Sequence, residues 1–358
     1  MHTNYRISII ILILVLCVLS VVSCDDSTTP PQEAPPQPAP QDHFVISGTT
    51  LVSYTGTDAL VRVPRGITRI GDRAFRHMGT VTGVELPDTV EHIGRQAFAW
   101  SGISEIIIPA SVKTIEEWAF QSCSGLERVV FSEESKLTTF GDSAWVGCRS
   151  LATVTLPPKL EALPAQAFMD CTALRTIELP ESLHTIGMEA FRDTGLERLT
   201  LPSNLQKIEL RAFYYAKALR SVTLSATPVD PSWKTLDDEE NGMGSYVFEG
   251  CDELRSFEVP ARCKHLKGWT FIGMNGLKTL KLHKGVRRYG EFLAQGDRGL
   301  QVVVQNADPT DTVVAPLVFP NAKPGSLNIQ VPAESLAAYR NSDAWRSYTN
   351  YIEAAQEN

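Results

Sequence analysis

The chain has 358 residues, of which 43% are hydrophobic and 21% are charged, and its formal net charge is −8. This composition can supply a sizeable core and excludes a chain that is disordered throughout. The acidic balance disfavours nucleic acid as a partner, because no basic stripe would displace counterions from phosphates, and it disfavours electrostatic binding of the body to anionic lipid.

The first 23 residues have the organisation of a secretory signal. Arg6 is the only Lys or Arg before an almost wholly apolar run over residues 9–22, which fits a signal core and is short for a membrane span. The run ends in V-V-S-C, which resembles the lipobox of bacterial lipoproteins. The resemblance implies cleavage before Cys24 and makes Cys24 the lipid attachment site. The alternative is an ordinary signal peptide with a chance cysteine.

Residues 24–43 are expected to form a lipid-anchored tether. Asp25 and Asp26 resemble a surface-export signal of Bacteroidetes lipoproteins, whereas acidic residues there resemble an inner-membrane retention signal in enterobacterial ones. Residues 27–41 are rich in proline, favour polyproline II and span roughly 45 Å. We expect an envelope protein held at the outer membrane by its N-terminal lipid alone and displayed at the cell surface.

After the tether, the chain repeats one motif along most of its length. An aromatic residue, usually preceded by alanine, recurs at Phe75, Phe98, Phe120, Trp145, Phe168, Phe191, Phe213, Phe248 and Phe271. The steps are 22 to 25 residues, except for one of 35. The composite motif is L-x-x-I-x-L-P-x-x-L-x-x-I-G-x-x-A-F-x-x-C-x-x-L. Such a period is typical of a solenoid, whose stacked units bury a core that none could bury alone.

Each position of the motif has a physical reason. Residues 174–179 illustrate the expected strand, with Ile177 and Leu179 facing inward and Thr176 and Glu178 facing outward. The proline that follows ends the ladder, because it has no N–H to donate. The glycine of the I-G pair suits a bend. Each coil contributes one large aromatic side chain to the core. Stacking of the coils aligns these side chains into a continuous column, which we call the spine.

The repeat has two insertions. Two residues are inserted between Phe131 and Phe140, and twelve are inserted at about residues 225–245, where an acidic run occupies residues 237–240. Insertions in solenoids map to loops on one face and often carry recognition. The longer insertion is therefore one candidate for ligand binding.

The motif becomes irregular after Phe271. In the next repeat, Tyr289 occupies the isoleucine position and Ala294 occupies the phenylalanine position. Residues 327–331 alternate as a last strand, and residues 334–351 are expected to form one or two short helices. The apolar anchors of these helices are Tyr339, Trp345, Tyr348 and Ile352. We expect them to cap the last coil.

The repeat resembles the BspA-like, or treponemal-type, leucine-rich-repeat surface proteins of bacteria, and the ending V-P-A-E-S-L-A-A-Y-R-N-S-D-A-W-R-S-Y resembles a terminal segment common in Bacteroidetes members. The resemblance implies a right-handed, mainly β leucine-rich-repeat solenoid, or horseshoe, with a short helical C-terminal cap. It also implies attachment to host matrix proteins, other bacteria or glycans. The expected organisation is a signal peptide (1–23), the tether (24–43), the solenoid (44–305) and a terminal strand with the helical cap (306–358).

Four cysteines share one column of the motif, three residues after the aromatic. In units of equal length that column contains Met78, Cys123, Cys148, Cys171, Ala216, Cys251 and Met274. Every member is small or apolar, which favours buried free thiols over a disulfide or a metal site, since no histidine accompanies them at zinc-like spacing. Cys263 is expected to be an unpaired cysteine in a loop.

The histidines and sequence motifs indicate no catalytic site. His92 and His184, the closest pair in repeat register, are four coils or about 19 Å apart, which excludes a shared metal ion. The sequence contains no serine-hydrolase, zinc-protease, phosphate-loop or EF-hand motif. We therefore expect no enzymatic activity, no metal and no cofactor.

Two columns of outward strand positions are better candidates for binding. One consists of Thr82, Ser104, Glu127, Ala152, Arg175, Glu197, Arg220, Arg255 and Lys278, and its C-terminal half is basic. The adjacent column is largely hydroxylated and contains Arg198. Together they give a candidate binding face for an acidic protein or an anionic glycan, formed by Arg175, Arg198, Arg220, Arg255 and Lys278. The alternative is a ladder of cross-strand ion pairs around Glu197.

These features predict a surface-exposed lipoprotein whose leucine-rich-repeat ectodomain binds a protein or glycan ligand, with host matrix as one candidate. Sheet faces of solenoids offer extended recognition surfaces without a deep pocket. One alternative is a structural or envelope-assembly role with partners in the same envelope, and a weaker one is an accessory role in glycan hydrolysis. Whether the insertion or the sheet carries recognition stays open.

Overall fold

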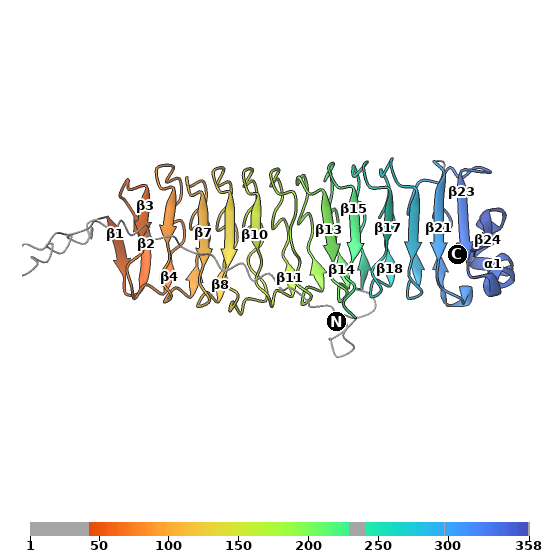
Figure 1. The fold of residues 1–358 in the computed structure, drawn as a ribbon, viewed down its shortest axis with the longest axis horizontal. Helices are drawn as coiled ribbons and strands as arrows, with labels where there is room; N and C mark the ends of the chain where they lie inside the picture. Colours follow the sequence, from red (N-terminus) through yellow and green to blue (C-terminus); the bar gives the residue numbers. More distant parts are fainter. Residues whose placement is uncertain (1–42, 229–240, 297, 357–358) are drawn as a thin grey trace, which may run out of the picture. The chain divides into compact units, whose positions relative to one another are not determined.

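Each sequence repeat forms one coil of a parallel β-solenoid in the computed structural model, which describes residues 43–228, 241–296 and 298–356. A coil contributes one strand to each of two rows, and successive coils place these strands side by side (Figure 1). The mainly β solenoid is thus confirmed. The signal peptide, Cys24, the tether up to residue 42 and residues 229–240 of the long insertion lie outside the described residues.

The first row contains the strands that precede the proline position of each repeat. Its members are β3 (Leu60–Arg62), β5 (Gly83–Glu85), β7 (Glu105–Ile108), β9 (Arg128–Phe131), β10 (Thr153–Thr155), β13 (Arg198–Leu201), β15 (Ser221–Leu224), β17 (Ser256–Glu258), β19 (Thr279–Leu282), β21 (Leu300–Val304), β23 (Leu327–Val331) and β24 (Ile352–Ala354). Neighbours pair in parallel within three sheets, β3 to β10, β13 with β15, and β17 to β24. In β7, Ile106 and Ile108 are buried while Glu105 and Ile107 are exposed, which confirms the period of two.

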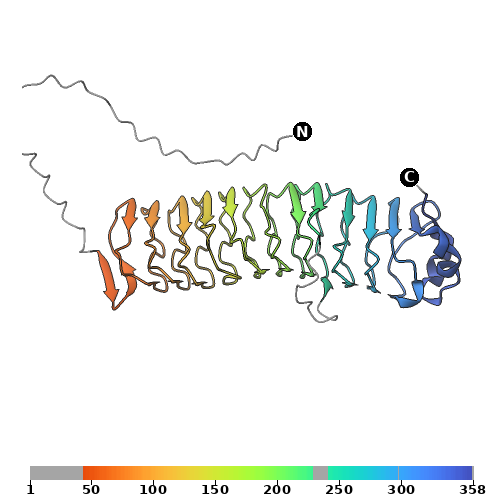
Figure 2. The ribbon, with the colours of Figure 1, turned by 60° about the horizontal axis from the view of Figure 1, so that its bottom comes forward.

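The second row starts with an antiparallel hairpin and continues with two-residue parallel strands (Figure 2). Its members are β1 (Phe44–Ser47), β2 (Thr50–Tyr54), β4 (Arg69–Ile70), β6 (His92–Ile93), β8 (Thr114–Ile115), β11 (Ala162–Leu163), β12 (Thr185–Ile186), β14 (Lys207–Ile208), β16 (Gly242–Met243), β18 (His265–Leu266), β20 (Arg288–Tyr289) and β22 (Val313–Val314). The row divides between β8 and β11, where the two-residue insertion lies.

The repeat aromatics form the expected spine inside the coils. The rings of Phe75 and Phe98 are 5.1 Å apart, and those of Phe98 and Phe120 are 5.0 Å apart and nearly parallel. Stacking continues through Trp145 and the later phenylalanines to Phe271. Because these side chains are almost fully buried between neighbouring coils, each coil depends on the next for its core.

The glycine of the I-G pair is required by close packing between coils. A Cβ added at Gly71 would lie 2.7 Å from the Leu51 carbonyl oxygen, and one added at Gly94 would lie 2.9 Å from the Ile70 carbonyl oxygen. The bend itself is made two residues later by non-glycine residues with positive φ, such as Arg73 (60°) and Gln96 (55°). The left-handed conformation of such residues carries a cost of about 1–2 kcal/mol each.

The expectation of a strand at residues 174–179 is wrong. Ile177 is buried and Thr176 and Glu178 are exposed, so the alternation persists. However, the backbone groups of residues 176–179 make no backbone hydrogen bond to any described residue. The first row is therefore interrupted between β10 and β13.

The interruption coincides with a wider spacing of the aromatic spine. Trp145 and Phe168 are 5.7 Å apart, and Phe168 and Phe191 are 5.8 Å apart. Trp145 is larger than the phenylalanine of other coils, and Phe140 packs against its edge at 4.8 Å. Ring spacing alone does not decide the pairing, because the rings of Phe248 and Phe271 are 6.2 Å apart although β17 and β19 pair in parallel.

Short helices close the C-terminal end, as expected. They are η1 (Pro309–Asp311), η2 (Ala333–Ser335), α1 (Leu336–Asn341) and η3 (Asp343–Tyr351). Tyr339, Trp345, Tyr348 and Ile352 are all buried. The Trp345 ring packs edge-on against Tyr289 at 5.3 Å, and β24 adds a final strand that the sequence did not indicate.

Candidate functional site

The basic half of the first outward column is partly neutralised by Glu197. Arg175 Nη1 and Arg220 Nη2 lie 2.7 and 2.8 Å from the two carboxylate oxygens of Glu197, one coil away on either side. The hydrogen bond from Arg175 and the charge of Arg220 lower the pKa of Glu197. The cross-strand ion pairs are therefore present, and two of the five candidate cations are engaged by them.

Arg255 and Lys278 are engaged by the turns beside the row. Arg255 Nη1 donates to the Gly276 carbonyl at 3.3 Å, and Arg255 Nη2 lies 4.0 Å from Glu253. Lys278 Nζ donates to the Arg298 carbonyl at 2.7 Å. These two cations thus stabilise adjacent coils.

Arg198 differs from the other four candidates. It is exposed on β13, in the hydroxyl-rich column next to Ser221. Within the described residues its guanidinium has no hydrogen bond and no ion pair within 4.0 Å. An exposed guanidinium without a partner can bind a carboxylate, a sulfate or a carbonyl of a ligand.

Two shallow grooves flank the interrupted segment of the first row. One, of about 480 Å³, lies between β10 and residues 176–180. The other, of about 420 Å³, lies between residues 176–181 and β13, and the side chain of Arg198 lines it. Both are lined by hydroxyl-bearing side chains, namely Thr153, Thr155, Thr176 and Thr200. Glu178 lines both grooves and Glu181 lines the second, so the grooves combine hydroxyl groups, two carboxylates, one cation and unpaired backbone groups at an exposed surface.

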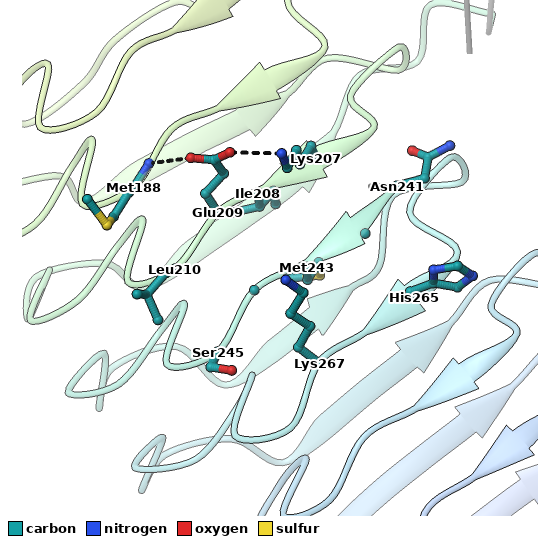
Figure 3. A pocket seen from close by; sticks show the side chains of 12 residues that line it. Met188, Lys207, Ile208, Glu209, Leu210, Asn241, Met243, Ser245, His265 and Lys267 are labelled. Carbon is teal, nitrogen blue, oxygen red and sulfur yellow. Dashed lines mark hydrogen bonds and ion pairs between the residues drawn. The ribbon is translucent and has the colours of Figure 1, made fainter. Parts of the chain in front are cut away.

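A third groove lies on the second row, at the end of the long insertion. It has a volume of about 450 Å³ and crosses the segment Gly242–Ser245 between β14 and β18. Figure 3 shows Lys207 and Glu209 on one side of this segment and Lys267 on the other. Glu209 is held in place, because its carboxylate lies 2.9 Å from Lys207 Nζ and accepts from the Met188 N–H at 3.1 Å.

The cysteine column is buried, as expected, and its thiols are free. Each thiol is within hydrogen-bonding distance of the carbonyl of the aromatic residue one coil earlier, for example Cys123 with Phe98 at 3.0 Å and Cys148 with Phe120 at 3.1 Å. Burial raises the pKa of Cys171 and of Cys251. These thiols are structural groups of the core.

Cys263 is unpaired and lies outside any strand or helix, as expected, and the structure adds that it is a buried core residue. It follows Pro260 by three positions and so occupies the leucine position of P-x-x-L, where Leu183 and Leu205 lie in other coils. Its thiol is 3.4 Å from the Gln206 carbonyl, and burial raises its pKa.

No metal site is found in the part of the chain that the structure describes, which contains no group of three or more His, Cys, Asp or Glu arranged to hold an ion. His92 Nδ1 lies 2.8 Å from Thr114 Oγ1. His184 lies 3.9 Å from Glu161, and burial lowers the pKa of His184. Among the described helices, none is long and apolar enough to cross a membrane.

Sequence comparison identifies the repeat. The family model "BspA type Leucine rich repeat region" matches residues 59–175, 138–230 and 234–305, in six copies. Among curated proteins, no relative matches the chain.

Several solved structures are similar to this chain. A leucine-rich repeat protein from Bacteroides ovatus is 20% identical, with a TM-score of 0.41, over 79% of this chain and 87% of that one. A leucine rich cell surface protein from Faecalibacterium prausnitzii is 18% identical, with a TM-score of 0.40, over 88% and 93%. The leucine-rich repeat protein of T. pallidum is 19% identical, with a TM-score of 0.35, over 79% and 91%. Because the family model covers more than half of its residues, the chain belongs to the BspA-type leucine-rich-repeat family.

Proposed function

We propose that the protein is a surface-exposed lipoprotein, anchored through Cys24, whose solenoid binds a protein or glycan ligand on its first row. The lipobox-like V-V-S-C sequence and the proline-rich tether support the anchor. The family supports display on the envelope. Several acyl chains would hold such a protein on a bilayer essentially permanently.

The observation that carries the binding site is the interruption of the first row beside Arg198. Elsewhere, β3 to β10 and β17 to β24 satisfy their backbone groups by pairing along the row. At residues 176–179 these groups face two open grooves and remain available to a ligand. Arg198 adds a cation with no partner among the described residues, so charge, hydroxyl groups and backbone groups converge at one place.

Extended polar surfaces of this kind suit macromolecular ligands better than small ones. The grooves are shallow, and they continue along the row rather than enclosing a small molecule. A linear glycan or an extended loop of a matrix protein can lie across several coils and make hydrogen bonds to each. Host matrix proteins and envelope glycans are therefore the ligands to test first.

The binding test uses a chain that starts at residue 25, so that it lacks the signal peptide and the acceptor cysteine. We expect it to bind an immobilised matrix protein or glycan, and Arg198→Glu to lower that affinity about tenfold, or by about 1.4 kcal/mol. Arg62→Glu is the matched control, because Arg62 lies on the same row and is paired with Glu85 at 2.8 Å. Equal effects of the two substitutions would place the ligand elsewhere.

Protease treatment of intact cells tests display. We expect the ectodomain to be removed from cells that carry the native chain, and Cys24→Ala to release the protein from the membrane fraction. If the ectodomain resists protease and crosslinks only to proteins of the same envelope, the envelope-assembly alternative replaces surface adhesion.

A further inference from the structure

Two neighbouring coils near the C-terminal end are rich in Lys and Arg, although the chain as a whole is acidic. Residues 261–290 contain no Asp or Glu but eight Lys or Arg residues, which are Arg262, Lys264, Lys267, Lys278, Lys281, Lys284, Arg287 and Arg288. The chain carries a net charge of −8, so this concentration is a local property of two neighbouring coils.

The second row brings several of these cations to one face. The ladder aligns Lys207 with Gly242, then with His265, then with Arg288. Coils repeat at about 4.8 Å, so Lys207 and Arg288 are separated by roughly 14 Å along the axis. Lys267 follows the same strand as His265 and is exposed. We name the surface formed by Lys207, His265, Lys267 and Arg288 the basic groove; the first three line the third groove described above, and Arg288 lies one coil beyond His265.

Lys267 and Arg288 are the two cations of the basic groove whose charges are not neutralised by an ion pair within the described residues. Both side chains are exposed, and neither has an ion pair with any residue that the structure describes. By contrast, Lys207 is paired with Glu209 at 2.9 Å, and Arg287 is paired with Asp311 at 2.6 Å. The basic groove therefore retains positive charge after its internal ion pairs are formed.

Small residues create the hollow beside these cations. Gly242 stands where the neighbouring coils carry Lys207 and His265, and a Cβ at Gly242 would lie 2.0 Å from the His265 carbonyl oxygen. The 450 Å³ hollow crosses this segment, with Lys207 and Lys267 on opposite sides of it (Figure 3).

An exposed aromatic side chain lies two residues from Lys267 in the sequence, outside the lining of the hollow. Trp269 follows Lys267 by two residues and is 38% exposed. Its ring is stacked between Tyr246, at 6.0 Å, and Phe292, at 4.4 Å. Leu210 and Met188 are also exposed and line the hollow. Apolar side chains beside cations suit sugars, because the C–H groups of a sugar ring pack on apolar surface while its charged groups pair with Lys or Arg.

We propose that the basic groove binds an anionic glycan, a polysaccharide whose sulfate or carboxylate groups pair with Lys267 and Arg288 and whose rings contact Leu210 and Met188. Charge complementarity selects the anion, and the exposed apolar side chains beside the cations favour a sugar ring over an acidic polypeptide. This site is on the second row, so it is separate from the first-row surface around Arg198 and independent of it.

The test measures binding of the soluble chain from residue 25 to immobilised heparin, which is sulfated, and to polygalacturonate, which carries carboxylates. Uncharged dextran serves as the neutral polysaccharide. We expect binding to at least one anionic glycan and none to dextran, and we expect higher salt to weaken it. The double substitution Lys267→Glu and Arg288→Glu should lower affinity at least tenfold. Binding to neither anionic glycan overturns the proposal.

The control is charge-matched and lies outside the basic groove. Lys113→Glu with Arg62→Glu reverses two charges on other coils, where Lys113 is paired with Glu91 and Arg62 with Glu85. This pair should leave heparin binding within about twofold of the native chain, and an equal loss would show that only net charge matters. Circular dichroism checks that all variants fold.

Two further variants separate the remaining interpretations. Leu210→Ala should weaken glycan binding several-fold with little effect on polyglutamate, whereas tight polyglutamate binding that is insensitive to Leu210→Ala identifies an acidic polypeptide as the ligand and overturns the proposal. Arg198→Glu is compared in the same heparin assay, because the first-row surface is a competing site. A loss with Arg198→Glu instead of the basic-groove variants would transfer binding of the anionic glycan to the first-row surface and overturn the proposal.

Discussion

The coils from β3 to β10 and the coils from residue 174 to β17 are built from the same motif but differ in their backbone pairing. In the first region every neighbouring pair of first-row strands forms a parallel ladder, and the spine rings from Phe75 to Phe120 are 5.0 to 5.1 Å apart. In the second region the ladder is broken on both sides of residues 176–179, and the rings of Phe168 and Phe191 are 5.8 Å apart. Coils built from the same motif therefore differ in backbone pairing, and the unpaired coil leaves backbone polar groups free at the surface.

The largest difference between the two regions should appear when a spine ring is removed. Phe98→Ala deletes a fully buried ring stacked on both sides and should lower the free energy of unfolding by about 3–5 kcal/mol. Phe168→Ala should cost less, near the lower end of that range, because its stacking contacts are longer. Urea unfolding of the soluble chain measures both, with the exposed Tyr215→Ala as a neutral control. An equal cost for the two rings would contradict the looser packing of the second region.

Thiol labelling should distinguish the two regions without any substitution. Cys123 and Cys171 are both fully buried, so alkylation requires local opening of the coils. We expect Cys171 to react about tenfold faster than Cys123, which corresponds to about 1.4 kcal/mol less local stability. Mass spectrometry of peptides after timed alkylation gives both rates. Equal rates would mean that both thiols are exposed only by global unfolding.

A glycine between the two regions should have a smaller effect. Gly147 has a φ of +73°, and the equivalent position one coil earlier is Ser122, with a φ of +54°. Gly147→Ala places a Cβ 3.0 Å from Ser122 Oγ in a left-handed conformation, at a cost of about 1 kcal/mol. Ser122→Ala is the matched control, because that position already tolerates a side chain. The midpoint of thermal unfolding should decrease for the first variant only.

The smallest effect should be the pH dependence contributed by buried histidines. Burial lowers the pKa of His184 and of His283, so the folded state binds protons less readily than the unfolded state does. Their contribution to stability is complete above the unfolded value of about 6.5 and is lost as the pH falls below it. Unfolding free energies at pH 7 and pH 5 should show this loss. The double variant His184→Gln and His283→Gln should reduce it, and an unchanged slope would exclude these two groups as its source.

The sequence was sufficient to predict the coil, its spine and its ion pairs, because these features depend on local periodicity. The recurring aromatic, the in–out alternation and the opposite charges of Glu197 and Arg220 are all set by residues one repeat apart. The buried cysteine column follows from the same register. The burial of Cys263 was not predicted, although its position within P-x-x-L is a signal for it in the sequence.

Other features had no local signal. Residues 174–179 have an ideal strand pattern, yet residues 176–179 form no backbone ladder with either neighbouring coil. The basic groove depends on Gly242 being aligned between Lys207 and His265, and the long insertion obscures this register in the sequence. Features that depend on the spacing between coils therefore required the structure.

Hydrogen exchange of the unliganded soluble chain tests most directly whether the first row is interrupted where Arg198 lies. We expect the amides of residues 106–108, which lie within the paired ladder, to be protected for hours, and those of residues 176–179 to exchange within seconds to minutes. Equal protection of the two segments would show that the ladder is continuous. The unpaired backbone groups on which the first-row binding surface depends would then not exist.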